Sequence, residues 1–220
     1  HKEKVLHAFQ QMYSRAIGTG PVRDYLAETG INVLKGASLL KPIPEGYTSD
    51  VEYADNPIAK ALRDVARVHI ADLGTRIFYT QHGGYDTHAN QIATHPRLLS
   101  ELSGAIMDFF QDLRDHHASE NVVMLVFTEF GRRVRDNGSG TDHGAGGGSF
   151  VIGDRITGGL YGTYPSLKIE DLDNGDLAHT YDFRGLYSSI LDDWMNIEPK
   201  NIVDGTFEKL PVVAQTGVES

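Results

Sequence analysis

The chain contains 220 residues, of which 40% are hydrophobic and 23% are charged, a composition that is typical of a folded domain and excludes collagen and wholesale disorder. Its formal net charge of −10 repels a phosphate backbone, which argues against nucleic acid as the main partner. No stretch approaches the ~18 consecutive apolar residues of a membrane-spanning helix. Cysteine is absent, so any metal ion must be held by histidine, carboxylate, carbonyl or water.

The N-terminal residues have the pattern of an amphipathic helix. Val5, Phe9 and Met12 recur at helical spacing and predict a face that packs against a neighbour. Because His1 leads directly into this stretch, without an initiator methionine or a signal-like segment, we expect the chain to be a fragment. Residues 18–57, rich in glycine, proline and turn residues, are predicted to form a loop excursion.

Helical and strand patterns then follow one another along the chain. Asn56 and Pro57 supply an N-cap and a first-turn proline for a helix that Gly74 should end. A β-branched and aromatic run predicts a strand at residues 76–80. Pro96 should open a long amphipathic helix.

A continuous apolar run at residues 122–127 is typical of a strand buried on both faces of a parallel sheet. Together with the preceding strand and helix, it predicts an α/β layer structure with ligand sites beyond the carboxyl ends of the strands. A short strand at residues 150–152 follows, and Asp182 is the expected N-cap of a last amphipathic helix.

Metal-capable side chains gather in three polar segments that follow or adjoin predicted strands. These segments are residues 83–90, 128–132 and 140–144. Carboxylate and imidazole are the usual ligands of zinc, manganese and similar ions, and glycine in each segment lets the backbone turn. Single residues also have ordinary explanations: Asp86 fits an Asx turn, Glu129 a surface carboxylate, and Asp142 an N-cap or turn.

The remaining histidines divide into two groups. His116 and His117 are expected at a helix end and His69 on the apolar face of a helix, so all three are interpreted as structural. For His82 and His179 two roles stay open, that of a metal ligand and that of a residue supporting a ligand.

The polar segments resemble the bacterial family called domain of unknown function 1501. The matching motifs are Gly-Gly-Tyr-Asp-Thr-His at residues 83–88, Thr-Glu-Phe-Gly-Arg at 128–132 and Gly-Thr-Asp-His-Gly at 140–144, in the same order. Later segments at residues 158–162 and 180–184 match as well, so that the resemblance covers residues 57–197.

That family is similar to the alkaline phosphatase and sulfatase superfamily. The resemblance implies a single α/β domain over residues 1–220, a three-layer α/β/α sandwich with a mainly parallel sheet, of which this chain is the C-terminal part. It also implies export to the periplasm, with the cytoplasm as the alternative. The superfamily's opening strand, which carries its nucleophile, has no counterpart in these residues.

The same resemblance implies a divalent-metal centre, with one ion (Zn, Mn, Ca or Mg) as the safer expectation. Arg132 would hold an anionic oxygen and is the expected catalytic residue. The expected metal ligands are Asp86, His88, Glu129, Asp142 and His143.

Two functions from different classes follow. The first is a metal-dependent hydrolase that acts on a small anionic substrate, a phosphate or sulfate ester. The second is a non-catalytic exported structural or interaction protein that binds a protein partner and keeps the fold.

Overall fold

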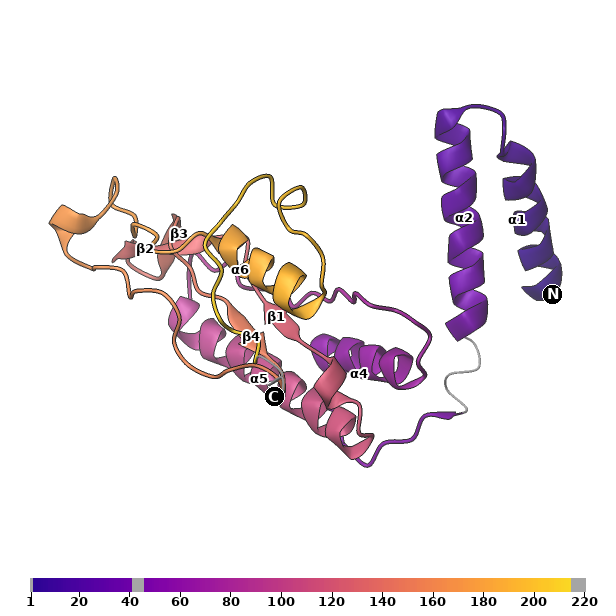
Figure 1. Ribbon diagram of the computed structural model, residues 1–220. Coiled ribbons are helices and arrows are strands. Elements are labelled where there is room, and N and C mark those ends of the chain that lie inside the picture. The colour runs from indigo at the N-terminus through magenta and orange to yellow at the C-terminus, as the bar shows by residue number, and fades with distance from the viewer. Residues whose placement is uncertain (1, 41–45, 215–220) are drawn as a thin grey trace, which may run out of the picture.

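The computed structural model describes residues 2–40 and 46–214 (Figure 1). A helical hairpin, made of α1 (Lys2–Ala16) and α2 (Pro21–Leu40), stands apart from the remaining elements. The other helices are α4 (Pro57–Ile70), α5 (Gln91–Asp115) and α6 (Phe183–Ser189), with short turns η1 (Ser119–Asn121), η2 (Ile169–Asp171) and the π-helical η3 (Ile190–Trp194). The strands are β1 (Met124–Val126), β2 (Gly131–Asp136), β3 (Thr141–Gly144) and β4 (Phe150–Ile152).

Helix α2 occupies residues 21–40 of the segment 18–57 in which a loop was expected, whereas residues 47–56 form neither helix nor strand and residues 41–45 lie outside the described ranges. The Asp24 carboxylate accepts the backbone N–H groups of Gly18 (2.6 Å) and Thr19 (3.2 Å), and so caps the turn before α2. Gly30, which suggested a loop, lies where the Tyr13 ring of α1 leaves no room for a Cβ atom. The glycine therefore marks a close helix contact.

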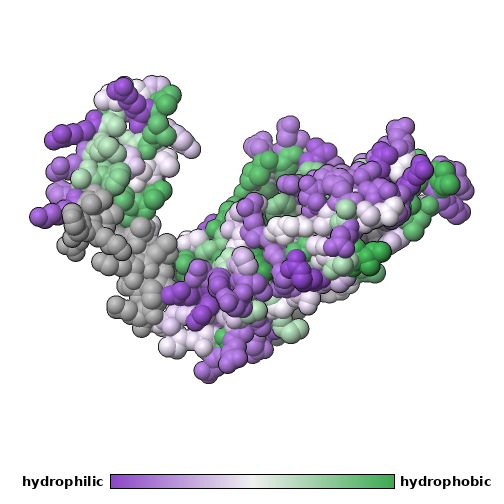
Figure 2. All heavy atoms as spheres, turned by 180° about the vertical axis from the view of Figure 1, so that it is seen from behind, coloured by the Kyte–Doolittle hydropathy of each residue, from purple (hydrophilic) through white to green (hydrophobic). Residues whose placement is uncertain are grey.

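Several apolar side chains of the hairpin stay exposed, and Figure 2 shows them as green patches. Val22, Tyr25, Leu26 and Val33 of α2 are each more than half exposed. Even so, no helix in the described ranges is long and apolar enough to cross a bilayer.

The core lies between α4 and α5. Asn56 caps α4 as expected, because its side chain accepts the Ala59 N–H at 2.9 Å. The helix ends at Ile70, four residues before Gly74. The buried residues that α4 and α5 contribute to one cluster are Ile58, Ala59, Leu62, Ala66, Ala105, Phe109, Phe110 and Leu113. Residues of β1 and β4 pack against this cluster.

Helix α5 begins earlier than expected, at Gln91 rather than Pro96. Pro96 lies inside the helix near its first turn, where the missing N–H removes one hydrogen bond. Two of the predicted structural histidines are confirmed: His69 Nε2 lies 3.0 Å from the Ala118 carbonyl oxygen, and His116 contacts the carbonyl oxygens of Asp112 and Thr48.

A buried carboxylate on α5 holds the segment that precedes α4 through hydrogen bonds. Asp112 is 0% exposed and accepts hydrogen bonds from the hydroxyls of Tyr47, Ser49 (2.6 Å) and Tyr53 (2.8 Å). Burial and these contacts raise the pKa of Tyr53 well above its usual range, so its hydroxyl stays a donor. A buried charge is stable only when it is paired in this way.

The expected three-layer α/β/α sandwich with a mainly parallel sheet is wrong for this chain. The regular secondary structure of the described residues is mainly helical, and their strands form two small antiparallel sheets, β1 with β4 and β2 with β3. Residues 76–80, where a strand was predicted, form neither helix nor strand and share no backbone hydrogen bond with any described residue. Phe127, at the end of the apolar run, is 49% exposed. An apolar pattern indicates burial but does not specify a pairing partner.

Two predictions for the C-terminal part of the chain are confirmed. Strand β4 coincides with the predicted strand at residues 150–152. Asp182 caps α6 by accepting the Arg184 N–H at 2.9 Å, as predicted, and η3 continues that helix to Trp194.

Replacing the buried carboxylate should destabilise the fold. We expect Asp112→Ala to lower the free energy of unfolding by about 3 kcal/mol, because three hydroxyl donors lose their acceptor. Asp115→Ala, on the exposed side of the same helix, should cost less than about 0.5 kcal/mol. Urea unfolding measures both values, and equal losses would contradict the role of Asp112.

A second change tests the β2–β3 hairpin. A Cβ atom on Gly131 would overlap the Gly146 carbonyl, so Gly131→Ala should lower the free energy of unfolding by about 1–3 kcal/mol. The matched control is Gly148→Ala, since a Cβ at Gly148 meets nothing within 4 Å. Thermal unfolding should separate the two variants, and a Gly131→Ala protein as stable as the control would show that this close approach is absent.

Candidate metal centre

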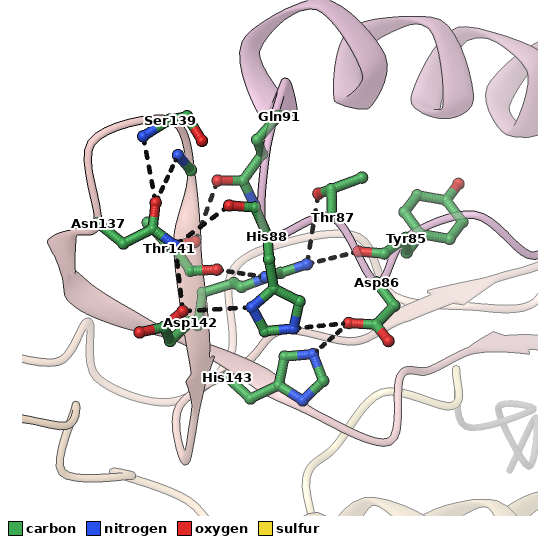
Figure 3. Close-up of polar contacts among 12 residues, drawn as sticks. Tyr85, Asp86, Thr87, His88, Gln91, Asn137, Ser139, Thr141, Asp142 and His143 are labelled. Atoms are coloured by element: carbon green, nitrogen blue, oxygen red, sulfur yellow. Dashed lines mark hydrogen bonds and ion pairs between the residues drawn. The ribbon is translucent and has the colours of Figure 1, made fainter.

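Two segments far apart in the sequence bring the expected ligands together (Figure 3). Asp86 and His88 lie in the loop before α5, and Asp142 and His143 lie on β3. In the β2–β3 ladder, Arg132 pairs with His143 and Asp136 with Thr141, so residues 133–135 lie opposite Asp142 alone. Such bulges re-aim side chains and are frequent beside active sites.

Three side chains point toward one another. The Asp86 Oδ1 atom lies 3.0 Å from Nε2 of His88 and 2.7 Å from Nε2 of His143. One ligand atom from each residue lies within 4.8 Å of the other two. Their side chains are 67%, 50% and 41% exposed, so a small molecule can reach all three from solvent.

This donor set fits a metal ion. Ligand atoms at ~2.0–2.2 Å from one ion lie about 3 Å from each other, close to the separations from Asp86 to the two imidazoles. The His88 and His143 rings lie 4.8 Å apart and tilt by 31°, which leaves both Nε2 atoms facing the carboxylate.

Asp142 lies behind His88 and outside this group of three. Its Oδ1 atom lies 3.2 Å from His88 Nδ1, on the side of the ring opposite Asp86. Asn137, in the turn between β2 and β3, donates its Nδ2 hydrogens to Asp142 Oδ1 and to the His88 carbonyl oxygen, both at 3.1 Å. The structure therefore places Asp142 against His88 and outside the group of three candidate donors.

Hydrogen bonding keeps both carboxylates ionised. The contact with His143 is the main cause that lowers the pKa of Asp86, with smaller contributions from His88. The hydrogen bond from Asn137, followed by that from His88, lowers the pKa of Asp142. Both residues therefore carry negative charge at neutral pH, as a cation site requires.

Arg132 joins the two segments. Its guanidinium donates to the carbonyl oxygens of Tyr85 and Thr141, each at 2.5 Å, and to Thr87 Oγ1 at 3.4 Å. These three contacts use three of the five N–H groups of the guanidinium. Arg132 therefore positions the two segments, and its expected role toward an anionic oxygen stays a prediction.

Phe130 fixes the orientation of His143. The two rings stack at 3.9 Å with an angle of 11° between their planes, and the Arg132 guanidinium lies 5.1 Å from the centre of the Phe130 ring. A ring held in this way loses little rotational freedom when it binds a ligand.

Glu129 and the two open histidines lie outside the group of three. Glu129 is exposed at a bend after β1 and does not belong to the described donors that lie within 4.8 Å of one another. His82 contacts the Tyr85 hydroxyl at 2.9 Å and Glu101 at 3.5 Å, and so supports the loop before α5. His179 contributes only a weak lowering of the pKa of Asp182.

Asn137 and Phe130 contact the candidate site but were not predicted from the sequence. The Asn137-Gly138 pair is a strong hairpin signal that could have placed the turn, because both residues suit a tight reversal. Gly138 has a φ of +101°, a conformation that favours glycine.

Removing the guanidinium should loosen the two segments. We expect Arg132→Ala to lower the free energy of unfolding by about 2 kcal/mol, the range for hydrogen bonds that involve a charged group. Arg135→Ala, an exposed position on the same strand, serves as the control and should change it by less than about 0.5 kcal/mol. Chemical denaturation measures the free energy of unfolding of both variants. An Arg132→Ala protein as stable as the control would show that the contacts of Arg132 do not stabilise the fold.

The comparison with protein families agrees with the motifs. A family model described as protein of unknown function (DUF1501) matches residues 47–206, extending beyond the expected range at both ends. No curated protein and no solved structure matches the chain. Since the matched residues make up more than half of the chain, this protein belongs to the DUF1501 family.

Proposed function

We propose that this protein is a metal-dependent hydrolase of phosphate or sulfate esters, with one ion held by Asp86, His88 and His143. The observation that carries the proposal is the convergence of these three donors from two segments on one exposed spot. Exposed carboxylates often gather without a metal, but the two imidazoles facing the same oxygen give this group a ligand geometry.

The ligand types favour zinc or manganese over calcium or magnesium. Calcium and magnesium bind mainly oxygen atoms, whereas two of the three donors here are imidazole nitrogens. Zinc is the ion we assign, because neutral imidazole and carboxylate are among its usual ligands and the chain offers no thiolate.

The arrangement suits catalysis better than a purely structural site. Structural zinc sites are closed by four protein ligands, whereas catalytic sites keep a position open beside three. Here three side chains form the group and all are reachable from solvent. When bound, such an ion supplies Lewis-acid polarisation of an ester oxygen.

The protein's own residues hold the site in shape. Arg132 ties the loop that carries Asp86 and His88 to β3, and Phe130 orients the His143 ring. The choice of phosphate or sulfate esters is supported by the similarity of the DUF1501 family, whose three motifs this chain carries, to the alkaline phosphatase and sulfatase superfamily. The resemblance to the DUF1501 family also supports export from the cytoplasm.

A second function, binding of a partner protein, is favoured by the hairpin. The exposed apolar side chains of α2 form a stripe that a lone helix pair does not bury. This function uses a different part of the chain and is compatible with the metal site.

Zinc titration of the metal-free protein tests the site directly. We expect one ion per chain, measured by competition with a chromophoric chelator, and a loss of affinity of more than 100-fold in Asp86→Ala and His143→Ala. This exceeds the ~10–100-fold that changes around the ligands usually cost. Glu129→Ala should bind zinc as the unchanged protein does, because Glu129 lies outside the group.

Hydrolysis of p-nitrophenyl phosphate and p-nitrophenyl sulfate then tests the activity. Activity should require added zinc and disappear in His143→Ala but not in Glu129→Ala. Zinc binding that Asp86→Ala and His143→Ala leave intact would overturn the site, and stoichiometric zinc without turnover of either ester would overturn the substrate class.

A further inference from the structure

We infer that His116 makes the docking of residues 47–53 against α5 depend on pH, because only its doubly protonated ring can bind Thr48 and Asp112 at the same time. The inference is independent of the metal site proposed above and concerns the other end of α5. It gives His116, which the sequence analysis interpreted as structural, a contact that changes with its charge.

Side chains hold residues 47–53 in place. These residues form neither helix nor strand, and every second one, from residue 47 to residue 53, is partly buried. No backbone–backbone hydrogen bond joins the segment to another element in the described part of the chain. Instead, the hydroxyls of Tyr47, Ser49 and Tyr53 donate to Asp112, and the His116 ring binds the Thr48 carbonyl oxygen.

Both ring nitrogens of His116 face backbone carbonyl oxygens, which only accept hydrogen bonds. Nδ1 lies 2.8 Å from the carbonyl oxygen of Asp112 and 3.2 Å from its carboxylate Oδ1, and Nε2 lies 2.9 Å from the carbonyl oxygen of Thr48. A neutral imidazole has one N–H donor, whereas the imidazolium has two. Either neutral tautomer therefore loses one of the two contacts, and only the imidazolium joins the segment to α5.

The surroundings of His116 favour its charged form. The hydrogen bond to the Asp112 carbonyl oxygen is the main cause that raises the pKa of His116, and partial burial of the ring opposes it. The hydrogen bond to Thr48 and the negative charges of Asp112 and Asp115 add to the rise.

The tyrosines and arginines packed around this contact keep their charge between about pH 6 and 8.5. Arg63 and Arg67 of α4 contact Tyr47, whose ring stacks on His116 with 5.7 Å between the ring centres. Arginine stays protonated in this range, and burial raises the pKa of Tyr47 and Tyr53 above the ordinary value of ~10. His116 is therefore the group at this contact whose charge changes.

Docking should be firmest at low pH. Because the docked ring has the raised pKa, its contribution is fully present below ~6.5, the ordinary pKa of histidine, and is lost as the pH rises through the pKa of the docked ring. The ratio of docked to released segment should fall tenfold for each unit by which the two pKa values differ.

NMR titration of the unchanged protein is the first test and needs no variant. Two-bond ¹H–¹⁵N spectra show whether each ring nitrogen of His116 carries a proton. We expect both nitrogens to be protonated at about pH 6 and the midpoint to lie above ~6.5, the value expected for the same residue in the urea-unfolded chain. A midpoint at or below that of the unfolded chain would overturn the inference.

Hydrogen exchange then measures the docking itself. The protection of the backbone N–H groups of residues 47–53, corrected for the intrinsic pH dependence of exchange, should fall between about pH 6 and 8.5 by the factor that the two NMR pKa values give. It should stay below the protection of Phe109 in the core, because the segment is released without unfolding of the core. Equal protection of both would show that the segment opens only with the whole fold, which contradicts its release.

Two variants assign the pH effect to one histidine. His116→Phe keeps a ring beside Tyr47 but donates no hydrogen bond, so the protection of residues 47–53 should be low and constant over this pH range. His117→Asn is the matched control, since His117 is exposed and asparagine tolerates its φ of +55°. It should keep the pH response, and a response that persists in His116→Phe or disappears in His117→Asn would overturn the assignment to His116.

Discussion

The candidate centre depends on the pair of hydrogen bonds by which Arg132 joins two distant segments of the chain. The guanidinium contacts Tyr85 in the loop before α5 and Thr141 on β3, and the ligand candidates lie within three residues of these two contacts. Two donors in a rigid plane hold two backbones at a fixed separation, which a single ammonium group would not do. The charge of Arg132 therefore serves geometry, and the carboxylate of Asp86 stays available to a cation.

The scaffold beneath this contact is the core of α4 and α5. Helix α5 starts directly after the loop that carries Asp86 and His88. Because Phe109 and Leu113 pack in the core and Asp112 accepts buried hydrogen bonds, α5 holds that side of the site in place. The other side is a short antiparallel hairpin, which has little core of its own. This explains why Asn137, Arg132 and Phe130 supply so many polar and stacking contacts there: side-chain contacts replace the burial that a larger sheet would provide.

The sequence predicted local structure better than architecture. The Asn56 and Asp182 caps depend on neighbours within three residues, and both were found from spacing alone. The parallel sheet was wrong, because the apolar run at residues 122–127 indicates burial without naming its neighbour, and its partner is an antiparallel strand. Of the five expected ligands, Asp86, His88 and His143 converge, Asp142 lies behind His88, and Glu129 lies apart. Which of several polar residues converge depends on the bulge in β2, and spacing does not reveal a bulge.

The central claim is that two imidazoles and one carboxylate share an ion. X-ray absorption of the zinc-loaded protein tests it most directly, since imidazole ligands give a characteristic scattering pattern. We expect two imidazole nitrogens at ~2.0–2.1 Å, with oxygen atoms completing the shell at ~2.0–2.2 Å. A shell of oxygen atoms alone, or of a single imidazole, would contradict the account.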